Sequence, residues 1–188
     1  MKISTEEKVI LLNAARDSIK SEFDEVEIQI PDYNKFPLLK SKCGAFVTIT
    51  ENKNLRGCIG YIISNKKLFE TVCDAAIQAA FHDPRFYPLQ KNELEKIKIE
   101  ISILSEPFPL KSYDEIQLGV HGLIVEEEGR RGLLLPQVPV EHKMNKEQYL
   151  DAICQKAGLP KNLWKEKQIK LNGFTATVFD EETIKEGK

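Results

Sequence analysis

A thiol lies between two glycines in the segment LRGCIG, residues 55–60, with an arginine two residues before it. Glycine inside a strand often marks a bulge or the close approach of a ligand or another backbone. The charge of Arg56 would favour the thiolate of Cys58, which could then act as a nucleophile or a metal ligand. The alternative is structural, with the arginine as a surface charge and Cys58 as a buried core residue beside two glycines that permit close packing, Gly57 and Gly60.

A base, a carboxylate and a guanidinium fall within five residues in HDPRF, residues 82–86. His82 could act as a general base that Asp83 orients, and Arg85 could bind a carboxylate or phosphate through two parallel hydrogen bonds. The alternative is a salt bridge between Asp83 and Arg85 that fixes the turn before Pro88.

Two more candidates come later in the chain. His121, in the segment GVHG, could move a proton, or it could be a hydrogen-bonded structural residue at the start of a strand. Gln137 lies between two prolines in LPQVP, which would present its amide in a fixed position. The alternative for this segment is an ordinary strand exit.

The common signatures of catalytic and metal sites are absent. The sequence contains no GxSxG, Walker A, GxGxxG or HExxH pattern and no standard zinc spacing. No CxxC pair occurs, so we expect free thiols in a reducing compartment at Cys43, Cys58, Cys73 and Cys154. No metal site is predicted, and the cofactor stays open.

The composition is that of an ordinary globular protein. Of the 188 residues, 41% are hydrophobic and 30% are charged, and the net charge is 27 − 29 = −2. This balance argues against nucleic-acid binding, which usually needs a basic excess. No apolar run approaches the length of a membrane span, and the N-terminus does not resemble a signal peptide, so we expect a cytoplasmic protein.

The hydrophobic periodicity predicts an alternation of helices and strands. We expect a helix that begins with the capping box of Ser4 and Glu7. An irregular but apolar segment, 21–42, and a polar, frayed tail, 181–188, are also expected. The predicted helices are 4–20, 66–81 and 145–157, and the predicted strands are 44–50, 55–63, 96–104, 119–126, 131–135 and 169–179.

Two parts of the chain repeat one pattern. The segments GAFVTITENKNLRGCIG and GLIVEEEGRRGLLLP share a glycine, a strand, a polar turn, an Arg-Gly pair and a second strand. A helix and an alternating strand follow each hairpin. We therefore predict an α+β fold with a mainly antiparallel sheet, packed helices, an internal duplication and an extra N-terminal helix.

These motifs together resemble the AMMECR-one family. The resemblance runs from about residue 5 to residue 180 and includes GAFVTIT, LRGCIG, DPRF, KIKIEISIL followed by SEP, GVHGLIVEEEGRRGLLLPQV, and YLDAICQKAGL with Trp164. LRGCIG is the family hallmark. Met144 departs from the family, where a tryptophan is expected, and this bears on packing.

The resemblance implies a single domain over 1–188, with two lobes and a cleft between them. It implies that the motif residues gather near the cleft: Arg56, Gly57, Cys58, Asp83, Arg85, His121 and Gln137. It also implies, by gene association, a Memo-type protein or a radical S-adenosylmethionine enzyme as partner. The oligomeric state stays open.

Two hypotheses for the function follow. In the first, the chain is an enzyme or enzyme subunit for a small or peptidic anionic substrate, which Arg56 and Arg85 orient. Cys58 would then be the nucleophile or covalent carrier, and His82 or His121 would move the proton. In the second, the chain is a non-catalytic module that binds a peptide or partner protein, and the thiol is only a small side chain in a tight strand.

Overall fold

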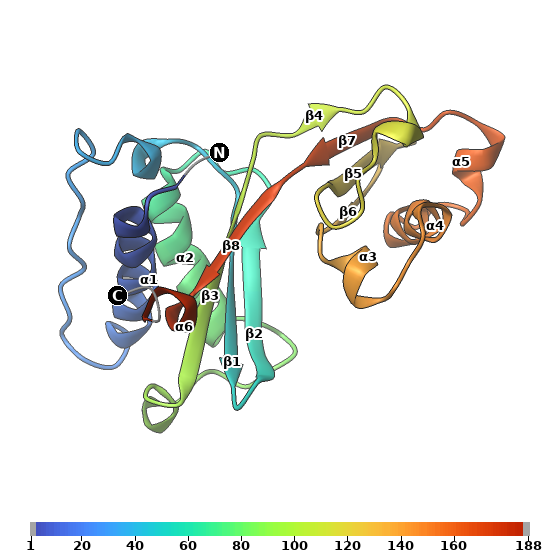
Figure 1. The fold of residues 1–188 in the computed structure, drawn as a ribbon. Coiled ribbons are helices and arrows are strands. Elements are labelled where there is room, and N and C mark those ends of the chain that lie inside the picture. Colours follow the sequence, from blue (N-terminus) through green and yellow to red (C-terminus); the bar gives the residue numbers. More distant parts are fainter. Residues whose placement is uncertain (1–2, 186–188) are drawn as a thin grey trace. The chain divides into compact units, whose positions relative to one another are not determined.

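The structure is a computed structural model, and it describes residues 3–185. The chain divides into two compact units (Figure 1). Unit 1 comprises Met1–Leu104 and Thr177–Lys188, and unit 2 comprises Ser105–Ala176. The fold is α+β with two mainly antiparallel sheets, as the sequence predicted.

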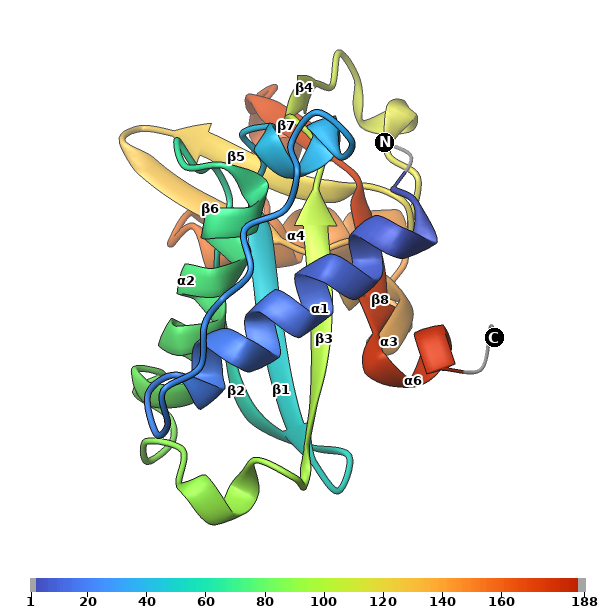
Figure 2. The same cartoon turned by 90° about the vertical axis from the view of Figure 1, so that its left-hand side faces the viewer.

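Unit 1 is a four-stranded sheet with two long helices on one face (Figure 2). The strand order is β2-β1-β3-β8, and β1 pairs antiparallel with β2 and with β3. The strands are β1 (Ala45–Glu51), β2 (Asn54–Tyr61), β3 (Ile97–Leu104) and β8 (Ala176–Asp180), and the helices are α1 (Thr5–Lys20) and α2 (Leu68–Phe81).

The core of unit 1 follows from the alternation in its strands. Ile97, Ile99, Ile101 and Ile103 of β3 are buried in one cluster with apolar residues of α1, α2 and β1. The predicted capping box begins α1, since the Ser4 hydroxyl accepts the Glu7 amide and the Glu7 carboxylate accepts the Ser4 amide. Both predictions are confirmed.

Unit 2 is a smaller sheet with three short helices. Its strand order is β4-β7-β5-β6, and Tyr149 and Ile153 of α4 are buried in its core. The strands are β4 (Phe108–Pro109), β5 (Gly122–Glu127), β6 (Arg130–Leu134) and β7 (Leu171–Phe174), and the helices are α3 (Val138–Glu141), α4 (Lys146–Lys156) and α5 (Leu163–Glu166).

The two sheets share one connectivity. In each, a hairpin is followed by a helix or helices and then by a strand that pairs with the first strand of the hairpin, giving β2-β1-β3 and β6-β5-β7. This is the connectivity that the predicted repeat requires. The duplication itself stays a prediction.

The predicted strand 169–179 is instead two strands in different sheets. β7 belongs to the sheet of unit 2 and β8 to that of unit 1. The break falls at Thr175, whose carbonyl accepts the Ser105 amide at 2.9 Å and whose amide donates to the Ser105 Oγ at 2.9 Å. Ser105 also lies where the chain leaves β3 for β4.

The segment 21–42 and the C-terminal tail complete unit 1. The segment 21–42 is irregular apart from a 3-10 helix, η1 (Pro37–Lys40), and its aromatic residues pack on the core of unit 1, as expected. The tail that we expected to fray begins with a short helix, α6 (Glu181–Lys185), and 186–188 lie outside the described residues. Glu181 forms an ion pair with Arg16.

Over residues 3–185, no helix has the length and hydrophobicity to span a membrane.

Candidate functional site

Arg56 sits at a bulge in β2. Ile49 of β1 pairs with Gly57 and Thr50 pairs with Leu55, so Arg56 has no partner in β1. Bulges re-aim a side chain, and they are common next to functional sites.

The side chain of Arg56 is already engaged. Its Nε donates to Glu93 Oε1 at 2.7 Å and its Nη2 to Glu93 Oε2 at 3.0 Å. Both side chains are largely buried, and Arg56 holds the pKa of Glu93 below its ordinary value of 4.5. Glu93 ends a 3-10 helix, η2 (Lys91–Glu93), so the pair ties this turn to β2. Among the described residues, Nη1 of Arg56 is buried without a hydrogen-bond partner.

The two glycines of LRGCIG lie in close contact with neighbouring backbone. A Cβ on Gly57 would lie 2.1 Å from the carbonyl oxygen of Ala79 in α2. A Cβ on Gly60 would lie 2.3 Å from the carbonyl oxygen of Ala45 and 2.5 Å from Cα of Phe46. No other residue fits these positions without a shift of backbone.

Cys58 is partly exposed, and its thiol contacts a hydroxyl. Thr48 Oγ1 donates to Cys58 Sγ at 3.3 Å, across the register that pairs these two residues. His82 is exposed at the C-cap of α2, and its imidazole makes no hydrogen bond with the thiol. The group that hydrogen-bonds the sulfur is therefore a threonine hydroxyl and not a histidine.

Asp83 and Arg85 bind the backbone of Cys58. The Cys58 amide donates to Asp83 Oδ2 at 2.9 Å, and Arg85 Nη2 donates to the Cys58 carbonyl at 3.3 Å. Arg85 also donates to the Asp83 carboxylate from Nε at 2.9 Å and from Nη2 at 2.7 Å. We call this arrangement the Asp83–Arg85 clamp. The salt bridge that the sequence left as the alternative is thus present.

The clamp has a buried end and an exposed end. The Asp83 side chain is 2% exposed, whereas that of Arg85 is 53% exposed. The hydrogen bonds from Arg85 hold the pKa of Asp83 well below its ordinary value of 3.8, and the Cys58 amide adds to this effect. Arg85 therefore favours the charged form of Asp83 and balances its charge.

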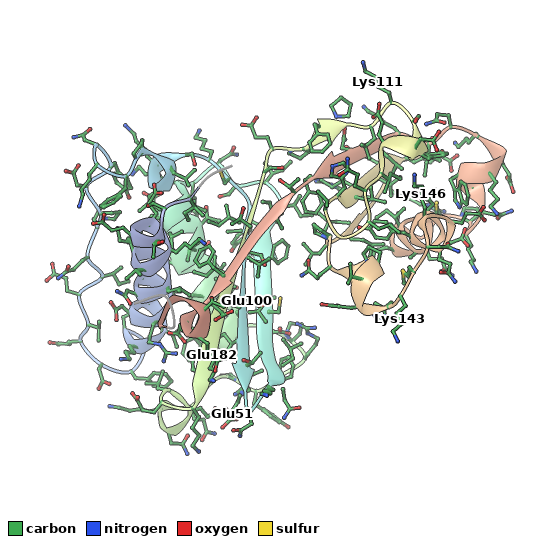
Figure 3. The ribbon with its side chains drawn as sticks, viewed as in Figure 1. Glu51, Glu100, Lys111, Lys143, Lys146 and Glu182 are labelled. Atoms are coloured by element: carbon green, nitrogen blue, oxygen red, sulfur yellow. The ribbon has the colours of Figure 1, made fainter. Side chains whose placement is uncertain are left out.

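A polar row crosses the face of the sheet away from α1 and α2. Thr48 pairs with Cys58 on one side and with Glu100 of β3 on the other. Figure 3 labels Glu100 and also Glu182, which comes from α6. A pocket of about 220 Å³ adjoins this row, lined by Thr48, Thr50, Lys98, Ile99, Glu100, Asp180, Glu181 and Glu182.

The two remaining candidates, His121 and Gln137, belong to unit 2. The His121 ring meets the Phe108 ring edge-on at 5.3 Å, and its Nδ1 accepts the Gln117 amide at 3.4 Å. Gln137 is the N-cap of α3, and its carbonyl accepts the amide of Glu141 at 2.9 Å. These contacts lie within unit 2, and the roles assigned to the two side chains stay predictions.

The structure also shows partners that the sequence analysis missed. Thr48 could have been found, because aligning the hairpin of 44–50 with 55–63 places it near Cys58. Glu93 had no such signal, since it lies 37 residues from Arg56 in an irregular connection. In the described part of the chain, no cluster of three or more histidine, cysteine or acidic side chains could hold a metal ion.

The whole chain can be compared with known proteins. A family model described as AMMECR1 matches residues 12–179. The chain belongs to the AMMECR1 family. This confirms the family that the sequence motifs indicated.

Relatives in the AMMECR1 family cover nearly the whole chain. A protein of Aquifex aeolicus is 40% identical over 178 residues, which is 91% of each chain. A protein of Methanocella arvoryzae is 38% identical over 189 residues, covering 95% of this chain and 93% of the relative. The crystal structure of an uncharacterized protein from Pyrococcus horikoshii matches with a TM-score of 0.84 and 36% identity over 97% of this chain and 95% of that one.

Proposed function

We propose that the chain is a polypeptide-binding module in which the hallmark segments of unit 1 hold one edge of the sheet ready for a partner protein. The observation that carries this proposal is that both arginines assigned to a substrate already hold carboxylates of the chain itself. Arg56 pairs with Glu93 and Arg85 pairs with Asp83. A paired guanidinium has lost most of its attraction for a second anion, because the carboxylate cancels its charge.

The surroundings of the thiol favour the same conclusion. A cysteine nucleophile is usually activated by an adjacent base, most often a histidine. The group that hydrogen-bonds Cys58 Sγ is the Thr48 hydroxyl, and His82 does not contact it. The pocket beside Thr48 contains four acidic side chains and one lysine, which does not suit an anionic substrate.

The partners that fit this module are those implied by the family resemblance. A Memo-type protein and a radical S-adenosylmethionine enzyme are both macromolecules, so either could present a chain segment to unit 1. Binding would use surface complementarity around β2, and the thiol of Cys58 would take no chemical part.

The test is a binding titration with purified proteins. The full chain is titrated with a purified Memo-type protein and with a purified radical enzyme from the same organism. Cys58→Ser is expected to change the Kd less than about twofold. Arg85→Ala removes the hydrogen bond to the Cys58 carbonyl, and we expect it to raise the Kd about tenfold. Lys35→Ala, in an exposed ion pair of unit 1 with Glu6, is the matched control. The proposal fails if neither protein binds, or if Cys58→Ser alone abolishes binding.

A second candidate function rests on the hydrogen bond from Thr48 to Cys58. A hydroxyl that donates at 3.3 Å to a partly exposed sulfur would orient that sulfur, and this favours an enzyme or enzyme subunit with Cys58 as nucleophile or carrier. The test is iodoacetamide labelling against pH with peptide mass mapping, using Cys43, Cys73 and Cys154 as internal controls. Labelling of Cys58 only after denaturation would exclude this function.

A further inference from the structure

β2 lies at the edge of its sheet, with β1 on one side and no described strand on the other (Figure 1). In an antiparallel pair, successive residues alternate in the direction of their main-chain donors and acceptors. The Leu104 amide donates to the Gly44 carbonyl at 2.9 Å, so the even positions of β1 bond toward β3. The residues of β2 opposite these positions must therefore point their N–H and C=O groups outward.

On the C-terminal side of the bulge at Arg56, these residues are Cys58 and Gly60. They pair with Thr48 and Phe46, respectively. The Cys58 amide donates to Asp83 instead of to β1, as this alternation requires. Gly60 follows two residues later without a register shift, so its N–H and C=O point to the same outer edge.

The Asp83–Arg85 clamp covers one of these two positions. At Cys58, the Asp83 carboxylate accepts the N–H and the Arg85 guanidinium donates to the C=O. At Gly60, no residue among 3–185 accepts the N–H or donates to the C=O. The edge is thus closed at one residue and open at the next outward-facing one. Unpaired edges of this kind are templates for another strand.

We infer that Gly60 anchors an added strand: an extended segment of a partner polypeptide pairs with β2 there, and the Asp83–Arg85 clamp ends the pairing at Cys58. This inference rests on the proposed binding function and gives its mode. Strand addition of this type obtains affinity from main-chain hydrogen bonds and specificity from alternate side chains.

The surroundings of Gly60 define the chemistry of the segment. A Cβ on Gly60 would lie 2.5 Å from Cγ of Phe46, so the Phe46 ring covers this glycine. The side chain of the paired residue would lie on the same face, beside that ring. Aromatic and β-branched residues give the most favourable cross-strand contacts with an aromatic ring. Beyond β2, Ile63 is 60% exposed and extends the apolar surface. The occupant is therefore an extended, β-branched or aromatic segment.

Hydrogen exchange of single amides tests the inference on the full chain. The probe is a short synthetic peptide of alternating valine and threonine with a lysine at each end. At saturation, exchange of the Gly60 amide is expected to slow by about tenfold or more. The Cys58 amide, already bonded to Asp83, is expected to change less than about twofold. The same peptide with every backbone nitrogen methylated should protect neither amide.

The control is made in the peptide because the added methyl of Gly60→Ala would collide with the backbone of Ala45. Binding of the peptide without protection of Gly60, or no binding at millimolar concentration, overturns the inference. Protection of Gly60 in the free chain, together with a dimer in sedimentation, would make a second copy the occupant and overturn the partner segment.

The two proposals can fail separately. If a Memo-type or radical enzyme binds the chain while exchange at Gly60 stays unchanged, the binding function stands and the added strand is wrong. If neither protein binds but the peptide protects Gly60, the edge site stands and the named partners are wrong.

Discussion

The Asp83 carboxylate accepts the backbone N–H of Cys58 at 2.9 Å, so a residue of the connection after α2 covers the edge of β2 at this one position. The two motifs that looked most chemical in the sequence are therefore bonded to each other through main chain and side chain. Their hydrogen bonds hold the backbone of Cys58, whose thiol is partly exposed.

Replacement of Asp83 by asparagine should destabilise unit 1. The variant leaves the Arg85 charge unbalanced and weakens the bond to the Cys58 amide. We expect a loss of about 1–3 kcal/mol in the free energy of unfolding, measured by urea denaturation. Asp24→Asn, in an exposed pair with Lys91, is the control and should cost less than about 0.5 kcal/mol. Equal losses in the two variants would show that the clamp contributes nothing.

The free energy of unfolding should decrease as the pH is lowered through the acid range. Asp83 and Glu93 both have a pKa below the ordinary values of 3.8 and 4.5 in the folded chain. A depressed pKa gives stabilisation that is complete above the unfolded value and is lost as the pH falls through the folded one. Urea unfolding at a series of pH values below about 4.5 should therefore show a decline, which Asp83→Asn makes shallower. An identical slope in the variant would contradict the assignment.

The close contact of β2 with α2 should make Gly57 intolerant of any side chain. Gly57→Ala places Cβ 2.1 Å from the Ala79 carbonyl oxygen, and helix backbone cannot move locally to accept it. We expect a cost of about 2–3 kcal/mol or more. Gly129→Ala adds the same methyl in open space at φ +73°, and should cost only about 1 kcal/mol. Thermal unfolding of both variants would decide, since equal costs are incompatible with the packing contact.

Removal of the Thr48 hydroxyl should slow the chemistry of the thiol. In Thr48→Val, the donor to Cys58 Sγ is lost while the shape is nearly kept. We expect iodoacetamide to label Cys58 about threefold to tenfold more slowly at fixed pH. Thr50→Val, on the same face of β1, is the control and should label at the wild-type rate. Unchanged labelling in Thr48→Val would mean that the hydroxyl does not affect the reactivity of the sulfur.

Local signals predicted most of the elements correctly. The capping box at Ser4 and the alternation of Ile97, Ile99, Ile101 and Ile103 are short-range patterns, and both are present in the structure. The helix α3 was missed because two prolines suggested a strand exit. Pro139 lies in the first turn of this helix, where its missing N–H costs nothing.

Long-range pairings were harder to predict. Apolar and polar residues alternate without a break from Phe174 to Val178, so the pattern around Thr175 does not show that β7 and β8 join different sheets. The partner of Arg56 is on a turn that only the folded chain brings near. The Asp83–Arg85 salt bridge was foreseen as an alternative, but its attachment to Cys58 depends on how α2 crosses β2.

The exchange of strands between the sheets has a consequence for synthesis. β1, β2 and β3 are synthesised before residue 105, but β8 is made only after unit 2. A nascent chain therefore carries an incomplete three-stranded sheet, with the outer edge of β3 unpaired, while some seventy further residues are translated. During this interval chaperones would meet an exposed strand that the finished protein never shows.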